Sequence, residues 1–301
     1  MPPDATPVAP PPTILHRPDG RALAYAEYGA PRGRPVLVFH GVPGTRLMWR
    51  NASEPASRHG LRLIAIDRPG FGASTPQPDR KLSDWQRDVT AVVDHLGVGK
   101  FAVAGVSGGG PFAVATAAAF GERVTALGLI SPMGPIASLQ YQIDLHFTDR
   151  FFFLRLPHRP RLMRVFFGVG NMLFRRNPRF HYDAFVRALP RADREILREL
   201  ALKKQVIEDV LESLKQGGDG ARSDMMIFSR PWDVEYESIT APAVLWQGTA
   251  DTIVPVPAAM RLGSMLPNCE VIRLPDAGHF WVYRNFETIM AKLRALIGQD
   301  R

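Results

Sequence analysis

Apolar residues along this chain gather in short runs that are separated by glycine, proline and polar residues. Four of these runs have the length and composition of strands buried in a parallel sheet; they cover residues 36–39, 61–66, 101–106 and 124–130. Ahead of them, the turn pair Asp19-Gly20 separates two strand-like runs, residues 13–16 and 22–28. The chain is therefore predicted to open with an antiparallel hairpin and to continue into parallel strands.

Helical patterns occur between the predicted strands. From Leu82 to Leu96, apolar residues recur at helical spacing, and Gly97 marks the expected end of that helix. The alternation lapses from residue 132 to residue 231, where helical and irregular segments rich in arginine and aromatic residues replace it. Strands are predicted again at residues 243–246 and 270–274, and helices at residues 256–266 and 285–297.

Alternating strands and helices imply right-handed crossovers and a sheet covered on both faces. We therefore expect an α/β fold with a mostly parallel, doubly wound sheet. The sheet and its helices come from two stretches of the chain, residues 13–131 and 231–301. Between them lies an inserted, mainly helical segment, residues 132–230, which is called the inserted segment below.

Composition adds limits on the class of protein. A chain of 301 residues with 46% apolar and 22% charged side chains is typical of a globular protein. The proline-rich stretch 1–12 lacks the basic start and apolar run of a secretory leader, so a disordered tail is expected there. The single cysteine, Cys269, excludes an internal disulfide and a thiolate-rich metal site. These features favour a cytoplasmic protein.

One uncharged stretch has nearly the length of a membrane span, residues 101–121. Its centre, Ser107-Gly108-Gly109-Gly110-Pro111, would break a membrane helix. The stretch is therefore interpreted as a short buried strand followed by an alanine-rich helix.

The net charge of +8 is concentrated in the inserted segment. Residues 136–230 contain 17 Lys and Arg against 11 Asp and Glu. No nucleic-acid-binding motif accompanies this surplus, so a solvated basic face is favoured over a nucleic-acid partner.

The strongest chemical signal is the pentapeptide Gly105-Val106-Ser107-Gly108-Gly109, which has the form G-x-S-x-G and stands between a predicted strand and a predicted helix. A sharp turn at that place forces the serine into a strained conformation and requires small residues two positions before and after it. The following helix directs its free N–H groups toward the serine. The alternative interpretation is an ordinary glycine-rich connection.

Other motifs occur at the ends of the predicted strands. They are His40-Gly41-Val42-Pro43-Gly44, Asp67-Arg68-Pro69-Gly70-Phe71-Gly72, Asp251 within Gly248-Thr249-Ala250-Asp251, and Gly278-His279. Together with the serine pentapeptide, and in this order, they resemble the α/β-hydrolase superfamily, in particular its serine esterase-like members with a helical lid.

The resemblance implies a catalytic triad and an oxyanion hole. Ser107 would be the nucleophile, His279 the base, and Asp251 the acid that orients the base. The backbone N–H groups of Val42 and Gly108 would bind the oxyanion. No cofactor and no metal ion is implied, and Asp67 is assigned a structural role in its turn.

Asp276 is the rival to Asp251, since it precedes His279 by only three residues. A side chain so close in sequence seldom reaches the far nitrogen of the imidazole, so Asp251 is preferred. A serine nucleophile implies an acyl-enzyme, and the expected substrate is a small to medium, mainly apolar ester or related acyl compound. Carbon–carbon bond hydrolysis, lactone hydrolysis, perhydrolysis and a receptor role remain open alternatives.

The inserted segment resembles the lid of such enzymes and is rich in large apolar residues: Phe147, Phe151, Phe152, Phe153, Leu156, Phe166, Phe167, Met172, Phe174 and Phe180. Packing onto the core is the simplest interpretation of this composition. Lining of an acyl pocket is favoured over docking on a membrane surface. The sequence leaves the oligomeric state open.

Overall fold

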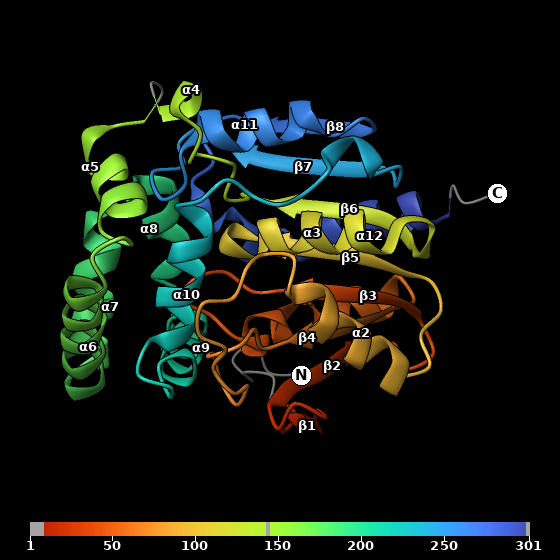
Figure 1. Cartoon of the computed structure of the whole chain (residues 1–301), viewed down its shortest axis with the longest axis horizontal. Coiled ribbons are helices and arrows are strands. Elements are labelled where there is room, and N and C mark those ends of the chain that lie inside the picture. Colours follow the sequence, from red (N-terminus) through yellow and green to blue (C-terminus); the bar gives the residue numbers. More distant parts are fainter. Residues whose placement is uncertain (1–8, 143–144, 299–301) are drawn as a thin grey trace.

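A central sheet organises the computed structural model, which describes residues 9–142 and 145–298. The sheet has eight strands in the order β1-β2-β4-β3-β5-β6-β7-β8 (Figure 1). The pairs β1–β2 and β2–β4 are antiparallel, and the pairs from β4 to β8 are parallel. The predicted α/β fold with a mostly parallel sheet is therefore confirmed. Residues 1–8 of the tail predicted to be disordered lie outside the described residues.

The strands fall close to the predicted runs. They are β1 Thr13–His16, β2 Ala22–Gly29, β3 Arg34–Phe39, β4 Leu61–Ile66, β5 Phe101–Val106, β6 Val124–Ile130, β7 Ala243–Gly248 and β8 Cys269–Leu274. The helices that accompany the sheet are η1 Arg46–Ala52, α1 Ser53–Arg58, α2 Trp85–His95, α3 Gly110–Phe120, α11 Val256–Met265 and α12 Phe286–Ile297. The uncharged stretch 101–121 forms β5, a turn and α3, as predicted. Among the described residues, no helix has the length and apolarity needed to cross a bilayer.

Helices cover both faces of the sheet, which explains why its strands are apolar without interruption. On β3, Leu37 and Phe39 belong to one apolar cluster, which also contains residues of α2, α3 and α11. Val36 and Val38 point to the opposite face and join a second cluster with residues of α1 and α12. Each fully buried aliphatic or aromatic side chain of this kind contributes about 1.5–3 kcal/mol to folding.

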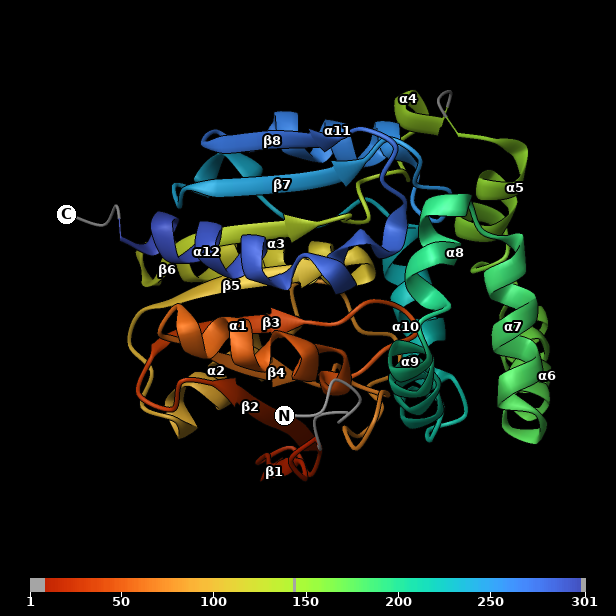
Figure 2. The same cartoon turned by 180° about the vertical axis from the view of Figure 1, so that it is seen from behind.

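The inserted segment is helical and lies beyond the carboxyl ends of the parallel strands (Figures 1 and 2). Its elements are α4 Leu139–Gln142, α5 Phe147–Asp149, η4 Arg150–Arg155, α6 Pro160–Arg176, α7 Pro178–Ala188, α8 Arg191–Leu197, α9 Leu200–Ser213 and α10 Asp219–Phe228. Both views show α8, α9 and α10 near the sheet, whereas α6 and α7 form the outermost layer. The inserted segment thus has an inner and an outer layer.

Acidic residues of α9 fasten the inner layer to the core. Asp209 accepts a hydrogen bond from the hydroxyl of Thr45, and both side chains are buried. Arg46 donates to Glu212 over 3.0 Å, and Arg50 donates to Glu208 over 2.9 Å. Because all three partners precede or lie within η1, α9 is held directly beside the turn that carries the predicted oxyanion donor.

Burial raises the pKa of Asp209 to about 7, against the opposing effect of the hydrogen bond from Thr45. In an unfolded chain the same carboxyl group has a pKa of about 4. Between these two values, the folded state binds more protons than the unfolded state. The free energy of unfolding therefore falls as the pH rises through this interval.

Replacing Asp209 by Asn should remove this contribution to the pH dependence of stability. Between about pH 5 and pH 8, we expect the parent protein to lose about 1–3 kcal/mol more of its free energy of unfolding than Asp209→Asn does. Urea unfolding at a series of pH values measures the difference. Stability profiles of parent and variant that run parallel over this range would contradict the raised pKa.

Candidate active site

The turn after β5 places Ser107 in a strained conformation. Its φ angle is +53°, in the left-handed region that non-glycine residues rarely adopt. A side chain added at Gly105 would lie within 2.6 Å of the carbonyl carbon of Gly109, and one added at Gly109 would lie within 2.7 Å of the carbonyl oxygen of His40. The predicted strain at the serine and the predicted need for small residues on both sides are therefore confirmed.

His279 and Asp251 form a buried pair at the same edge of the sheet. The Nδ1 atom of His279 lies 2.8 Å from Oδ2 of Asp251. The carboxylate also accepts hydrogen bonds from the side chain of Gln247 at 3.0 Å and from the backbone N–H groups of Ile253 and Val254 at 2.8 and 3.0 Å. This arrangement fixes the carboxylate and aims it at the imidazole.

Opposing effects determine the pKa of Asp251. Burial alone would raise it, but the neighbouring His279 and the hydrogen bonds of the backbone hold it below its ordinary value. A carboxyl group in this state stays ionised at neutral pH. It can therefore stabilise a positive charge on the imidazole of His279.

The rival acid, Asp276, has a different environment. It is exposed to solvent, and its φ angle is +56°. Its backbone N–H donates to the hydroxyl of Thr249 over 2.9 Å, which makes it part of the tight turn after β8. The structure thus brings His279 together with Asp251, the residue that the sequence analysis preferred.

Ser107 and His279 both follow the carboxyl ends of parallel strands, β5 and β8. The topology therefore places them at one edge of the sheet, where sites of open α/β sheets lie. Among the described residues, no hydrogen bond joins Oγ of Ser107 to Nε2 of His279. Such bonds are commonly long before substrate binds.

The turn that carries the predicted oxyanion donors packs against the serine. A side chain added at Gly41 would lie 3.4 Å from Cβ of Ser107. One added at Gly108 would lie 2.7 Å from Cγ2 of Val42 and 3.1 Å from the ring of Phe228. Val42 and Gly108, the two predicted donors, therefore lie on segments in direct contact, and Phe228 of α10 closes the space beside them.

Arg68 stabilises the turn at His40 and Gly41. Its guanidinium group donates to the carbonyl oxygens of His40 and Gly41, and it donates to Asp224 of α10 over 2.8 and 3.0 Å. Arg68 and Asp224 are fully buried, and Asp224 also pairs with Arg80. A buried charge pair of this kind fixes geometry, because loss of either partner leaves the other charge uncompensated.

His40 is a structural member of the same turn. Its Nε2 accepts a hydrogen bond from the backbone N–H of Arg68 at 3.1 Å, so its Nδ1–H donates to the carbonyl oxygen of Gly41 at 2.8 Å. Burial and the charge of Arg68 lower the pKa of His40 well below its ordinary value, which keeps the ring neutral.

Asp67 is likewise buried and accepts hydrogen bonds from the backbone N–H groups of Arg46 at 2.7 Å and Ala73 at 3.3 Å.

Asp193 of α8 is a site residue that the sequence analysis missed. Its carboxylate accepts hydrogen bonds from the backbone N–H groups of His279 at 2.9 Å and Phe280 at 2.7 Å. The same carboxylate fills the space that a side chain on Gly278 would need. Burial raises the pKa of Asp193 above its ordinary value, although the two N–H groups oppose this effect. Asp193 therefore acts as a positioning residue for the loop that carries His279.

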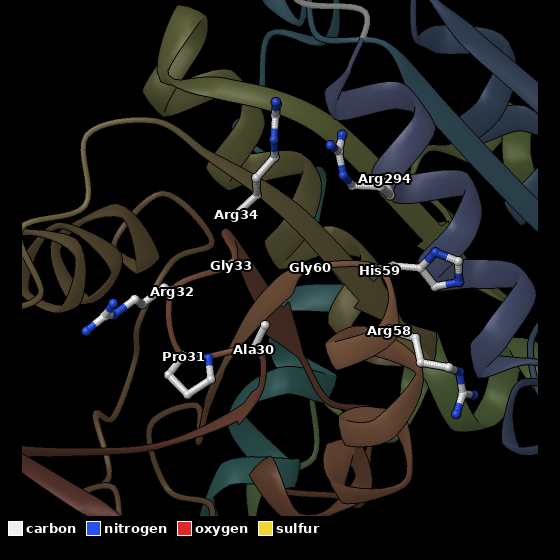
Figure 3. A pocket seen from close by; sticks show the side chains of 9 residues that line it. All are labelled: Ala30, Pro31, Arg32, Gly33, Arg34, Arg58, His59, Gly60 and Arg294. Atoms are coloured by element: carbon white, nitrogen blue, oxygen red, sulfur yellow. The ribbon is translucent and has the colours of Figure 1, made fainter.

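Other features of the surface lie apart from this site. In the ranges that the structure describes, no three His, Cys, Asp or Glu side chains gather in a way that could hold a metal ion. A hollow of about 770 Å³ is lined in part by Arg32, Arg34, Arg58 and Arg294 (Figure 3). It lies at the amino ends of β3 and β4, opposite the edge that carries Ser107. Its arginine side chains point in different directions rather than toward one centre.

Comparison with known proteins identifies the class. The family model for the alpha/beta hydrolase fold matches residues 34–285, so the chain belongs to this family. A curated relative, the dihydrolipoyllysine-residue acetyltransferase component of an acetoin cleaving system from Pseudomonas putida, is 28% identical over 287 residues, which is 92% of this chain and 67% of that protein. A bifunctional esterase/perhydrolase from Acinetobacter calcoaceticus is 27% identical and covers 93% of this chain and 97% of its own.

Solved structures agree on the fold. An esterase from Thermogutta terrifontis superposes with a TM-score of 0.67 at 22% identity, covering 96% of this chain and 99% of that one. Other matches have other named activities, among them a probable proline iminopeptidase, a 2-hydroxy-6-oxo-2,4-heptadienoate hydrolase and an enol-lactonase. The comparisons therefore show a hydrolase family with several chemistries at low identity.

The contacts of His279 predict how the two candidate acids differ. Asp251→Asn should lower kcat by about 10³–10⁴-fold, because an amide behind the imidazole favours the wrong tautomer and gives no charge stabilisation. Asp276→Asn should change kcat by less than about 2-fold, as expected for an exposed side chain. Steady-state kinetics on an activated ester compares the two, with thermal unfolding as the check on folding. The opposite ranking would overturn the assignment of Asp251.

Asp193→Ala should lower kcat/KM by about 10–100-fold, because the loop of His279 would lose two hydrogen bonds that fix its position. The same change should cost about 1–3 kcal/mol of stability for each buried N–H group left without a partner. Asp193→Asn keeps one acceptor oxygen and should recover part of the activity. Because it removes a negative charge near His279, it should also move the acid limb of the pH profile of kcat/KM to lower pH.

The matched control for Asp193 is Asp183→Ala, since Asp183 also lies in the inserted segment but is half-exposed and pairs with Lys203. This control should leave the pH profile unchanged. A purely structural role for Asp193 would predict a loss of stability in Asp193→Asn with no displacement of the acid limb.

Proposed function

We propose that this chain is a serine hydrolase that cleaves a carboxylic ester, or a related acyl compound, of small to medium size and mainly apolar character. The observation that carries the proposal is a strained serine turn at the same sheet edge as a buried histidine–aspartate pair. A serine hydroxyl is a weak nucleophile at neutral pH unless a base removes its proton. Asp251 and His279 supply that base in an oriented form.

The proposed mechanism proceeds through an acyl-enzyme. Nε2 of His279 takes the proton of Ser107, and the serine oxygen attacks the acyl carbon. The N–H groups of Val42 and Gly108 donate to the oxyanion that forms, and His279 then gives its proton to the departing alcohol. A water molecule, deprotonated by His279, attacks the acyl-serine, and as the bond to the serine oxygen breaks, His279 returns the proton to that oxygen and the acid leaves. Neither a cofactor nor a metal ion takes part in these steps.

An apolar wall beside the serine supports an apolar acyl group. Val42 is partly buried, and its side chain lies next to Gly108. Phe228 also lies against Gly108, next to the proposed oxyanion donors. A substrate bound there would exchange water for these side chains, and each added methylene group would contribute about 0.8 kcal/mol.

The same triad can serve other reactions, namely carbon–carbon bond hydrolysis, lactone hydrolysis and perhydrolysis, and a hydrolase-like receptor would keep the same fold. We place the ester first because one relative, which matches this chain over nearly its whole length, is named as an esterase/perhydrolase.

We also propose a cytoplasmic location. Burial raises the pKa of Cys269, the one cysteine of the chain, to about 11, so the thiol stays protonated and unreactive.

Ser107→Ala should abolish labelling by a fluorophosphonate probe and lower kcat by about 10³-fold or more, since only binding and the oxyanion donors would remain. Ser264→Ala is the matched control, because Ser264 is exposed and its hydroxyl donates only to the carbonyl oxygen of Arg261. Gel fluorescence after labelling and turnover of an activated ester provide the two measurements. Labelling that persists in Ser107→Ala would remove this serine as the nucleophile.

A panel of p-nitrophenyl esters of increasing acyl length, assayed beside lactones, separates the alternatives. The proposal expects turnover of esters with a maximum at short to medium acyl length. Turnover confined to lactones would replace the ester by the lactone. Binding without turnover of any compound would favour a receptor.

A further inference from the structure

The outer layer of the inserted segment has an unusual share of exposed apolar area. Of the twelve large hydrophobic residues exposed in the described parts of the chain, ten lie between residues 147 and 185. Val165 and Met172 are each 60% exposed, and Phe147 is 75% exposed. Concentrations of this kind mark interaction surfaces rather than ordinary solvent-facing surface.

The exposed apolar residues of α6 form a single stripe. At about 100° per residue, they fall within an arc of about 120° on the helix. The apolar stripe consists of Leu162, Val165, Phe166, Val169, Met172 and Leu173. The opposite side of α6 packs inward: Met163 is buried, and the amide of Asn171 donates to the carbonyl oxygen of Leu214 over 3.4 Å. The apolar stripe therefore faces away from the inner layer, and at its edge the ring of Phe166 contacts the ring of Phe152 in η4 at a centroid distance of 5.8 Å.

Positive charge accompanies the apolar stripe. Residues 150–187 contain nine arginines and one acidic residue, Asp183, which gives a net charge of +8. The rest of the chain contains 28 basic and 28 acidic residues and is therefore neutral. Arg161, Arg164 and Arg176 belong to α6, and none of them forms an ion pair within residues 9–142 and 145–298. Six of the nine arginines and Asp183 lie in α6 and α7, so the layer that exposes the apolar stripe has a net charge of +5.

We propose that this layer binds the surface of an anionic phospholipid bilayer, with α6 lying in the plane of the interface. An amphipathic helix with arginines beside an apolar stripe binds there by burying its apolar side chains and by attraction to anionic headgroups. Each arginine near such a surface strengthens binding by about 5-fold. Figures 1 and 2 show α6 and α7 as the outermost layer, so this face can approach a flat surface without obstruction from the sheet.

A second copy of the chain fits this face less well. In a symmetric dimer the layer would meet itself, so six arginines would oppose six arginines with a single aspartate on each side. An anionic bilayer supplies the complementary charge that a second copy lacks.

The outer layer, α6 and α7, contacts the loop that carries His279. The ring of Phe185 in α7 makes an edge contact with the ring of Phe280 at a centroid distance of 6.0 Å, and Phe280 follows His279. The outer layer and the proposed site thus lie on the same side of the molecule, beyond the carboxyl ends of the parallel strands. The binding itself does not rest on the proposed hydrolase activity.

Flotation with lipid vesicles tests the proposal without any measurement of turnover. The full chain is mixed with vesicles of equal parts phosphatidylglycerol and phosphatidylcholine, or of phosphatidylcholine alone. Binding to the anionic vesicles is expected at about 0.01 M salt and should weaken strongly at about 1 M salt, where the screening length falls from roughly 30 Å to roughly 3 Å. No binding to anionic vesicles at low salt would overturn the proposal.

Two variants assign the binding to α6. The triple change Arg161→Gln, Arg164→Gln and Arg176→Gln should weaken partitioning into anionic vesicles by about 100-fold. The triple change Val165→Ser, Val169→Ser and Met172→Ser should weaken it by more than about 10-fold. Neither set includes a residue of the proposed mechanism. If the proposed function holds, turnover of a soluble ester shows that each variant is folded and active. If the protein proves to have no hydrolase activity, circular dichroism shows whether each variant is folded.

The matched control removes the same charge elsewhere, by Arg32→Gln, Arg87→Gln and Arg273→Gln, which are exposed outside the inserted segment. This control should change partitioning by less than about 2-fold. Equal weakening in the control and in the α6 arginine variant would overturn the proposal, because net charge alone would explain the binding. A dimer in sedimentation that the Val165→Ser, Val169→Ser, Met172→Ser variant converts to a monomer would also overturn it, because the stripe would then be a self-interface.

Discussion

Backbone contact between three segments fixes the position of Ser107. In the turn after β5, Gly109 has no room for a side chain because the backbone of Phe39 and His40 lies against it, and Gly105 has none because Gly109 itself lies against Gly105. Within this turn, Ser107 adopts a positive φ angle, which costs of order 1–3 kcal/mol and persists only because the surrounding contacts enforce it. Since the turn of His40 follows β3 directly, the proposed nucleophile and the proposed oxyanion donors form one rigid unit.

Buried acidic residues of the inserted segment stabilise this rigid unit and the loop of His279 through hydrogen bonds. Asp224 compensates Arg68, which holds the carbonyl groups of the oxyanion turn. Asp209 bonds to Thr45, next to the same turn, and Asp193 bonds to the backbone of the loop of His279. The inner layer is thus tied to the core by charge and hydrogen bonds. The outer layer has the opposite character, with arginines and an apolar stripe turned away from the core, which is why we assign it a separate partner.

The sheet could be predicted from the sequence because each strand is a local apolar run bounded by turn residues. Ser107, Asp251 and His279 could be proposed because their motifs, in this order after predicted strands, resemble those of the α/β-hydrolase superfamily. Asp193 could not be found in this way. It lies 86 positions from His279, in a helix whose local pattern does not distinguish it from any surface acid.

The same limit applies to Asp224, which lies 156 positions from Arg68. Contacts between a core loop and an inserted helix depend on tertiary packing, so they cannot be predicted from the hydrophobic periodicity of either segment. The aromatic residues of the inserted segment were a different case. Composition does not distinguish Phe152 from Phe166; the two rings contact each other at a centroid distance of 5.8 Å, but Phe152 packs against the core and Phe166 is 48% exposed. They lie in different elements, η4 and α6, and the placement of each element, rather than the residue type, determines which ring faces the core.

Rapid-mixing kinetics with a p-nitrophenyl ester, combined with peptide mapping of the quenched protein, test the serine mechanism most directly. The mechanism predicts a burst of p-nitrophenolate of about one equivalent per chain when deacylation is slow, with the acyl group on the peptide that contains Ser107. Turnover with the acyl group on another residue, or with no acylated peptide under conditions that give a burst, would contradict it.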